Sequence, residues 1–124
     1  MDFDLLVVGA GPAGLAAAIR AKQINHDLSI CVVEKAPEVG SHILSGAVMD
    51  PIGLDELIPD WQEKKAPLKT KVTRDNFAFL SEKNRFNVPG WLLPDTFKNS
   101  NCYVGSLGLL VRWLGSQAED LDIE

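Results

Sequence analysis

Three glycines near the start of the chain have a spacing that proteins use to bind phosphate. Gly9, Gly11 and Gly14 follow the pattern G-x-G-x-x-G. In such a motif the first glycine permits a tight turn, the second lets the backbone approach a pyrophosphate without an intervening Cβ, and the third lets a helix pack closely on a strand. The first-turn N–H groups of that helix have no intrahelical partner and lie at the positive end of its dipole. The spacing therefore predicts a turn that binds the pyrophosphate of a dinucleotide.

An acidic residue follows at the distance that this motif requires. Glu34 ends the apolar run Ile30–Val33, about 20 residues after Gly14, where an acid accepts hydrogen bonds from an adenosine ribose. Pro12 suits the first turn of a helix, because its missing N–H costs little there. A glycine-rich turn in an ordinary α/β protein is the alternative, and the agreement of these features argues against it.

The glycines and the acid must be positioned by a strand–helix–strand unit. Four large apolar residues, Leu5–Val8, predict a strand that is buried on both faces, as in a parallel sheet. A helix is expected from Pro12 to Ile24, and Ile30–Val33 should form a second strand parallel to the first. The side chains expected on the inner face of the helix are Leu15, Ala18 and Ile19.

The composition is that of an ordinary globular domain. The chain has 124 residues, of which 46% are apolar, and its net charge is −5. This charge argues against a general nucleic-acid binder. Cys31 and Cys102 have no partner at C-x-x-C spacing, so we predict neither a metal site nor a disulfide framework within the chain.

Beyond Glu34 the chain is expected to form loops and then a hairpin. Residues 36–49 combine little charge with several small residues, and Pro59 should end a short helical turn. Apolar residues alternate with others at 77–79 and again at 86–88, and polar residues separate the two runs. This pattern predicts a β-hairpin.

Two further segments allow two interpretations each. The basic cluster Lys64, Lys65, Lys69, Lys71 and Arg74 forms either a solvated face or a docking surface for an acidic partner or lipid headgroup. The apolar residues 89–94 form either a buried corner of the core or a surface patch that meets lipid or a hydrophobic ligand.

The chain is expected to end with an amphipathic helix. Ser106 can cap this helix, and its apolar side chains recur at helical spacing. A further strand is expected to begin at Asp122–Glu124, because two parallel strands alone would leave open edges. We therefore expect the sequence to be the N-terminal piece of a longer protein.

The motifs resemble those of a known family. Gly9–Leu15 and Val33–Lys35 resemble the FAD-binding start of glutathione-reductase-type flavoproteins. Further segments resemble the electron transfer flavoprotein–ubiquinone oxidoreductases, in order along essentially the whole chain: Val39–Ala47, Asp50–Pro51, Leu57–Trp61, Ala66–Leu68, Val72–Thr73 and Trp113–Glu119. The fold class that this implies is α/β, with a Rossmann-like FAD-binding βαβ unit and an inserted loop and β-hairpin region. This FAD-binding fold is expected to be incomplete in the given sequence.

The resemblance implies a role in electron transfer. Members of that family carry FAD, a [4Fe–4S] cluster and a ubiquinone site, and they pass electrons from reduced electron transfer flavoprotein to ubiquinone. They sit on one face of a membrane, which is the cytoplasmic face of the bacterial inner membrane or the matrix face of the mitochondrial one. The four cluster cysteines are absent from this chain. The chain alone is therefore expected to bind FAD poorly or not at all and to be inactive.

The resemblance also assigns residues to the cofactor. No catalytic residue is predicted, because FAD does the chemistry and the protein tunes it. For His42 a structural hydrogen bond and proton transfer both remain open. The residues expected to bind FAD are Val8, Gly9, Gly11, Pro12, Ala13, Gly14, Glu34, Lys35, His42, Ser45 and Gly46.

The chain is expected to consist of three segments with different roles. Residues 1–35 form the first βαβ half-unit, residues 36–100 face the flavin, the quinone and the membrane, and residues 101–124 lead into the next strand. Within the second segment, Val39 to Asp60 is expected to meet the membrane, with Trp61 at the boundary. A well-packed loop over the flavin is the alternative for that stretch.

Two other functions compete with this one. The chain could belong to a different flavoprotein of the same superfamily, such as a geranylgeranyl reductase or a hydroxylase, but the similarity beyond Glu34 argues against this. It could also be an inactive folding module or truncated product, which its end before a third strand favours.

Overall fold

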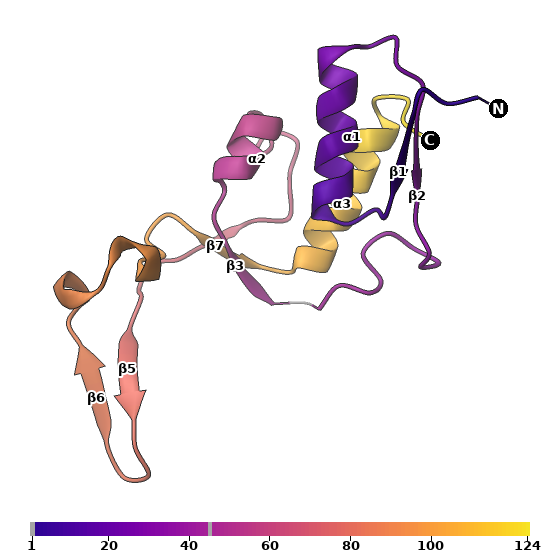
Figure 1. Cartoon of the computed structure of the whole chain (residues 1–124). Coiled ribbons are helices and arrows are strands. Elements are labelled where there is room, and N and C mark those ends of the chain that lie inside the picture. The colour runs from indigo at the N-terminus through magenta and orange to yellow at the C-terminus, as the bar shows by residue number, and fades with distance from the viewer. Residues whose placement is uncertain (1, 45) are drawn as a thin grey trace.

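The first part of the chain folds as the expected strand–helix–strand unit. The computed structural model describes residues 2–44 and 46–124. Strand β1 (Leu5–Val8) is followed by helix α1 (Pro12–Ile24) and strand β2 (Ile30–Val33), with the bounds expected from the sequence. The two strands are parallel, and their register places Leu5 opposite Ile30 (Figure 1). The chain is therefore a mixed α/β structure that begins with a parallel βαβ unit.

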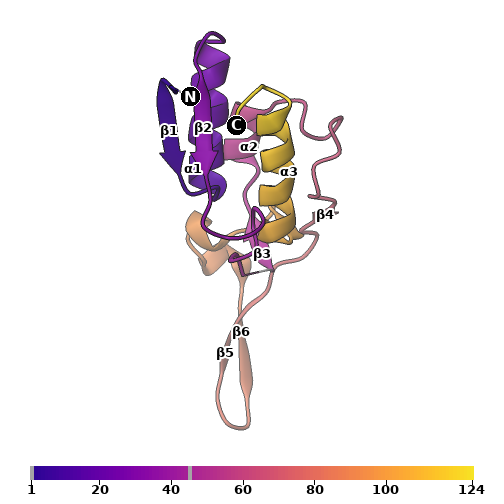
Figure 2. The same cartoon turned by 90° about the vertical axis from the view of Figure 1, so that its right-hand side faces the viewer.

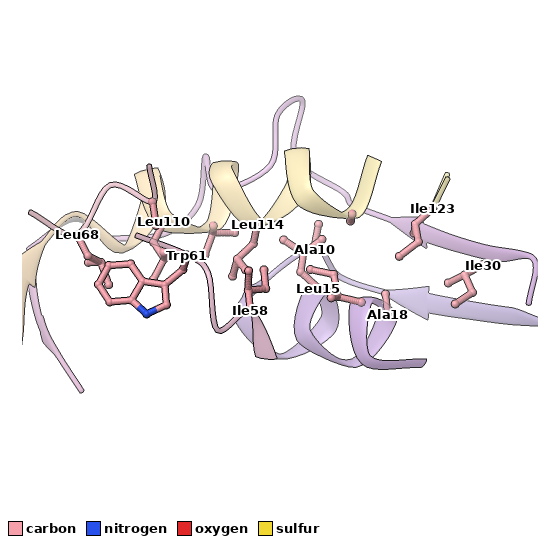
Figure 3. Packing of buried hydrophobic residues seen from close by; sticks show 14 residues of the cluster. Ala10, Leu15, Ala18, Ile30, Ile58, Trp61, Leu68, Leu110, Leu114 and Ile123 are labelled. Carbon is pink, nitrogen blue, oxygen red and sulfur yellow. The ribbon is translucent and has the colours of Figure 1, made fainter. Parts of the chain in front are cut away.

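Two helices cover one face of these strands. Helix α3 (Leu107–Glu119) lies side by side with α1, although the two are far apart in the sequence (Figures 1 and 2). Ser106 caps α3 as expected, because its Oγ accepts a hydrogen bond of 3.3 Å from the amide of Leu109. The core runs between the helices and the strands (Figure 3), and its most completely buried large side chains are Ile19, Ile30 and Val111.

The other face of β1 and β2 is open, which corrects the expectation of burial on both faces. Leu6 is 58% exposed, Val8 81% and Val33 42%. Side chains alternate between the two faces of a strand, and the helices cover only the face that carries Leu5 and Val7. Continuous apolar composition therefore did not determine which residues are buried.

The C-terminal residues lie along the free edge of β2. The amide of Val32 donates to the carbonyl oxygen of Glu124 at 2.6 Å, and the amide of Glu124 donates to the carbonyl oxygen of Ile30 at 3.0 Å. One residue that bonds to two residues of a neighbour in this way has the pattern of a parallel ladder. Ile123 is buried beside it.

A small antiparallel sheet lies between the βαβ unit and the hairpin. It has the order β3–β7–β4, formed by β3 (Ala47–Met49), β7 (Tyr103–Gly105) and β4 (Thr70–Lys71). This sheet was not predicted, because strands of two or three residues are too short to show an alternating pattern in the sequence. Helix α2 (Ile52–Leu57) follows β3 and is slightly longer than the expected helical turn.

Trp61 belongs to the core, which corrects its expected place at a membrane boundary. It is 3% exposed, and its Nε1 donates a hydrogen bond of 2.6 Å to Asp55 Oδ1. Its ring meets Tyr103 edge to face, with centroids 5.5 Å apart. A buried indole needs a partner for its N–H, and Asp55 provides one.

The expected hairpin is present and projects from the body of the molecule (Figures 1 and 2). It consists of β5 (Phe77–Leu80) and β6 (Arg85–Val88), followed by the short 3₁₀ helices η1 (Gly90–Leu92) and η2 (Asp95–Phe97). We call residues 75–99 the arm. At its base, Asp75 Oδ2 accepts hydrogen bonds from the backbone and side-chain nitrogens of Asn99, at 3.0 and 2.9 Å.

The described residues contain three α-helices, and none of them combines the length and hydrophobicity that crossing a bilayer requires.

Candidate nucleotide-binding site

The glycine turn after β1 has the geometry that its spacing predicts. Gly9 adopts a φ of +103°, which L side chains rarely adopt, and its amide donates to the carbonyl oxygen of Val33 at 2.7 Å. A β-carbon at Gly14 would lie 2.0 Å from the carbonyl oxygen of Gly9, so only glycine permits α1 to pack this closely. A β-carbon at Gly11 would meet nothing within 4 Å, and the space in front of this residue is open.

The N-terminus of α1 presents free amides beside this opening. Gly11 is the N-cap residue, Pro12 begins the helix, and the amide of Leu15 donates to the carbonyl oxygen of Gly11 at 3.0 Å. The amides of Gly11, Ala13 and Gly14 precede that bond and have no acceptor among the described residues. Together with the helix dipole, these donors favour an anion at this place.

Glu34 lies at the end of β2 and faces the same turn. Its Oε2 accepts a hydrogen bond of 2.9 Å from the amide of Ala10, and its Oε1 accepts one of 2.9 Å from the amide of Ala36. These bonds lower the pKa of Glu34 below its ordinary value, the Ala36 amide having the largest effect. Partial burial opposes this lowering, and the charge of the nearby His42 adds to it. The carboxylate is therefore ionised at neutral pH.

The two hydrogen bonds leave Glu34 able to bind a ligand. An ionised carboxylate has about four acceptor positions, and the backbone amides use one on each oxygen. The remaining positions can accept hydrogen bonds from two ribose hydroxyls. Binding of the turn and binding of a ribose are therefore compatible roles for this side chain.

Several of the expected site residues meet at the open ends of the two strands. A depression of about 350 Å³ is lined by Val8, Gly9, Val33, Glu34 and Lys35. It lies at the carboxyl ends of β1 and β2, where ligands bind in open α/β sheets. The parallel register that brings Val8 opposite Val33 creates this depression.

The other described residues expected at the site do not line this depression. His42 is exposed and near enough to Glu34 to act on it electrostatically. Gly46 is also exposed, with a φ of +90°, and it does not line the depression. Pro12 and Ala13 are exposed at the start of α1. Ser45 lies outside the described residues.

The backbone groups that hold Glu34 were not predicted from the sequence. The amides of Ala10 and Ala36 bond to it, but any non-proline residue has an amide, so the sequence carries no signal for them. The packing of residues 36–43 on α3, where Gly40 approaches Gly108, was not predicted either. The two glycines are visible in the sequence, but their pairing is not.

The geometry fits a nucleotide diphosphate with an attached ribose. The ionised Glu34 and Gly9 line the depression, and the open space at Gly11 and the free amides of α1 follow Gly9 directly in the glycine turn. A parallel βαβ unit with these features defines the class of the chain, which is an α/β nucleotide-binding domain.

Comparison with known proteins narrows the class to a family. The family model described as "FAD binding domain" matches residues 4–65, which is half of the chain. The chain belongs to this family.

The chain is also similar to curated proteins along its whole length. It is 56% identical over 127 residues to the mitochondrial electron transfer flavoprotein-ubiquinone oxidoreductase of Dictyostelium discoideum, covering 99% of this chain and 20% of that protein. It is 52% identical over 129 residues to the electron transfer flavoprotein-ubiquinone oxidoreductase of Pseudomonas aeruginosa, covering 100% of this chain and 23% of that protein. The mitochondrial electron transfer flavoprotein-ubiquinone oxidoreductase of Rattus norvegicus is 52% identical over 128 residues, covering 99% of this chain and 20% of that protein. The resemblance predicted from the motifs is confirmed, and the chain spans about a fifth of these relatives' length.

Proposed function

We propose that this chain is the N-terminal FAD-binding part of an oxidoreductase that passes electrons from reduced electron transfer flavoprotein to ubiquinone. The observation that carries this proposal is the identity of 52 to 56% with oxidoreductases of that name over 99% or more of the chain. The family match over residues 4–65 and the open glycine turn support FAD as the cofactor.

In this proposal the βαβ unit is the beginning of a Rossmann-like FAD-binding domain. The free amides of Gly11, Ala13 and Gly14 bind the pyrophosphate, and Glu34 accepts hydrogen bonds from the adenosine ribose. Val8, Lys35, His42, Ser45 and Gly46 lie near other parts of the cofactor. FAD, when bound, supplies the electron-transfer chemistry, and the chain's own residues bind and orient it.

The remaining parts of the proposal concern the full-length protein. Residues 1–35 form the first half-unit, residues 36–100 face flavin, quinone and membrane, and residues 101–124 lead into the next strand. A [4Fe–4S] cluster would be held by residues outside this chain, and ubiquinone would accept the electrons. Both bacterial and mitochondrial relatives occur, so the membrane is the bacterial or the mitochondrial inner one.

Two groups of exposed apolar side chains support contact with a membrane surface. In the segment Val39 to Asp60, Leu44 is 92% exposed, and Val48 and Ile52 are also exposed. The arm carries a larger group, and the exposed basic residues Lys69, Lys71 and Arg74 come just before it in the chain. We therefore extend the proposed membrane surface to the arm, whose exposed apolar residues are Phe79, Leu80, Phe86, Trp91, Leu92 and Phe97.

The proposal is tested by changing the acid of the nucleotide site in the full-length protein. Glu34→Arg should abolish retention of FAD, because it removes the ribose acceptor and the bonds to Ala10 and Ala36. The measurement is the flavin absorbance of the purified protein, followed by reduction of ubiquinone with reduced electron transfer flavoprotein. Glu63→Arg makes the same charge change at an exposed position and should leave both unchanged.

Each outcome bears on a different part of the proposal. Full FAD retention in Glu34→Arg would contradict the placement of the ribose. A parent protein that holds FAD but does not reduce ubiquinone would favour another flavoprotein of the superfamily.

A further inference from the structure

The loop after β2 is held against α3 by an unusually close backbone contact. We call residues 36–43 the β2 loop. Gly40 has a φ of +82°, and a β-carbon there would lie 2.9 Å from the carbonyl oxygen of Gly108. About two turns further along α3, a β-carbon at Gly115 would lie 3.5 Å from Val39 Cγ1. The absence of a β-carbon at Gly40 therefore lets the loop lie directly on α3.

Arg112 lies between these two contacts and binds the loop. Its Nε donates a hydrogen bond of 3.3 Å to the carbonyl oxygen of Val39, and its Nη2 lies 3.4 Å from Glu38 Oε2. The pair with Glu38 is exposed, and an exposed ion pair contributes little to stability. The bond to the Val39 carbonyl has a different consequence, because it fixes the main chain of the loop.

The β2 loop acts on Glu34 at both of its ends. The amide of Ala36 at its start donates to Glu34 Oε1, and His42 near its end acts on the same carboxylate electrostatically. Between them, Val39 lines a small cavity of about 100 Å³ together with Glu34 and Gly115. Movement of the loop away from α3 would therefore displace groups that orient Glu34.

We infer that Arg112 is a positioning residue for the adenosine end of the nucleotide site. By holding Val39 on α3, Arg112 keeps Ala36 and His42 against Glu34, so the carboxylate is already aimed before the ligand binds. Orientation before binding raises affinity because less freedom is lost on binding. The inference rests on the proposed function, in which Glu34 binds the ribose of FAD.

The test measures FAD binding to the full-length apoprotein by titration. Arg112→Ala should weaken FAD affinity by roughly threefold to tenfold, the effect of one hydrogen bond, while the melting temperature changes little because the side chain is about half exposed. Arg112→Lys should recover much of the affinity, since an ammonium can reach the same carbonyl oxygen. Arg20→Ala, which removes an exposed arginine from α1, is the matched control.

A second pair of variants moves the loop without touching Arg112. Gly40→Ala introduces a β-carbon 2.9 Å from the Gly108 carbonyl oxygen and should also weaken FAD binding. Gly108→Ala places its β-carbon 3.5 Å from the Gly40 carbonyl oxygen, which is an ordinary contact, and should bind FAD like the parent.

The pH profile separates positioning from general stability. With the loop released, Glu34 loses the Ala36 bond that most lowers its pKa, so the acidic limb of FAD binding should move to higher pH in Arg112→Ala. Glu119 and Glu124, which line the same small cavity, and Lys35 are present in both proteins, and displacement of His42 would raise the pKa of Glu34 in the same direction. A merely structural role of Arg112 would leave this limb in place.

The outcomes distinguish the inference from the function on which it rests. Parent-like affinity and pH profile in both Arg112→Ala and Gly40→Ala would overturn the inference while FAD binding itself stands. A parent protein that binds no FAD would overturn both.

Discussion

The carboxylate of Glu34 accepts a hydrogen bond of 2.9 Å from the amide of Ala10, and this bond joins the end of β2 to the glycine turn that follows β1. The acid that the motif assigns to a ribose therefore also holds the turn in place. Its second oxygen binds Ala36 at the start of the β2 loop. Glu34 thus connects the end of β2, the glycine turn and the β2 loop.

The ionisation of Glu34 should make stability depend on pH. Its pKa is lowered on folding from an ordinary value near 4.5, so the unfolded state binds the proton more tightly. The stabilisation from this carboxylate is then complete above the ordinary pKa and is lost as the pH falls through the lowered pKa. Urea unfolding of the parent protein and Glu34→Gln should differ most near neutral pH, and this difference should shrink in acid.

Glu63→Gln is the matched control for that measurement, because Glu63 is exposed on the surface. A difference between the parent protein and Glu34→Gln that is the same at neutral and acidic pH would contradict the assigned role of the two amide bonds.

Gly14→Ala should destabilise the domain and remove FAD binding together. The new β-carbon would lie 2.0 Å from the Gly9 carbonyl oxygen and 3.3 Å from Val7 Cγ1, so α1 must move away from β1. Overpacking against backbone of this kind costs about 3 kcal/mol. Gly53→Ala in α2 is the control, because its β-carbon would meet nothing within 4 Å. Equal unfolding midpoints for the two variants would show that the close contact is not needed.

Trp61→Phe should lower the free energy of unfolding by about 2 kcal/mol, because it removes the hydrogen bond to Asp55 and part of a buried ring system. Trp91→Phe should change it by less than about 0.5 kcal/mol, since Trp91 is 80% exposed. Chemical denaturation followed by circular dichroism measures both. A larger loss of unfolding free energy in Trp91→Phe than in Trp61→Phe would contradict the assignment of Trp61 to the core.

Membrane binding should depend on the arm more than on the segment Val39 to Asp60. Replacing Leu80 and Phe86 with Asp should weaken binding to phosphatidylglycerol-containing vesicles by roughly tenfold or more, because two large apolar side chains no longer enter the interface. Replacing Leu44 and Val48 with Asp should have a smaller effect. Co-sedimentation of the full-length protein with vesicles measures both, and unchanged binding of the arm variant would rule the arm out as a membrane surface.

The local features of the site could be predicted because each depends on a few neighbouring residues. The bounds of β1, α1 and β2 follow from the apolar run, the glycines and Pro12. The hairpin follows from two alternating runs about a polar turn, and the cap of α3 follows from Ser106. Backbone freedom, side-chain periodicity and capping act over short distances in the sequence, so the sequence displays them directly.

The features that were missed or predicted wrongly depend on contacts between distant residues. Continuous apolar residues in β1 gave no sign of which face the helices would cover, and Leu6 is exposed as a result. The sequence alone is compatible with Trp61 at a membrane interface or in the core. Its contacts with Asp55 and Tyr103 in the folded structure show that it belongs to the core. The contact between Gly40 and Gly108 joins segments separated by most of the chain.

The sequence by itself determined the glycine turn, the helix that begins there and the acid at the end of the second strand, because local backbone geometry and side-chain chemistry dictate them. Only the tertiary structure decided how that acid is held, since its partners are backbone amides that any residue supplies. It also decided that α3 supports the β2 loop, because such a contact exists only once packing brings Arg112 to Val39.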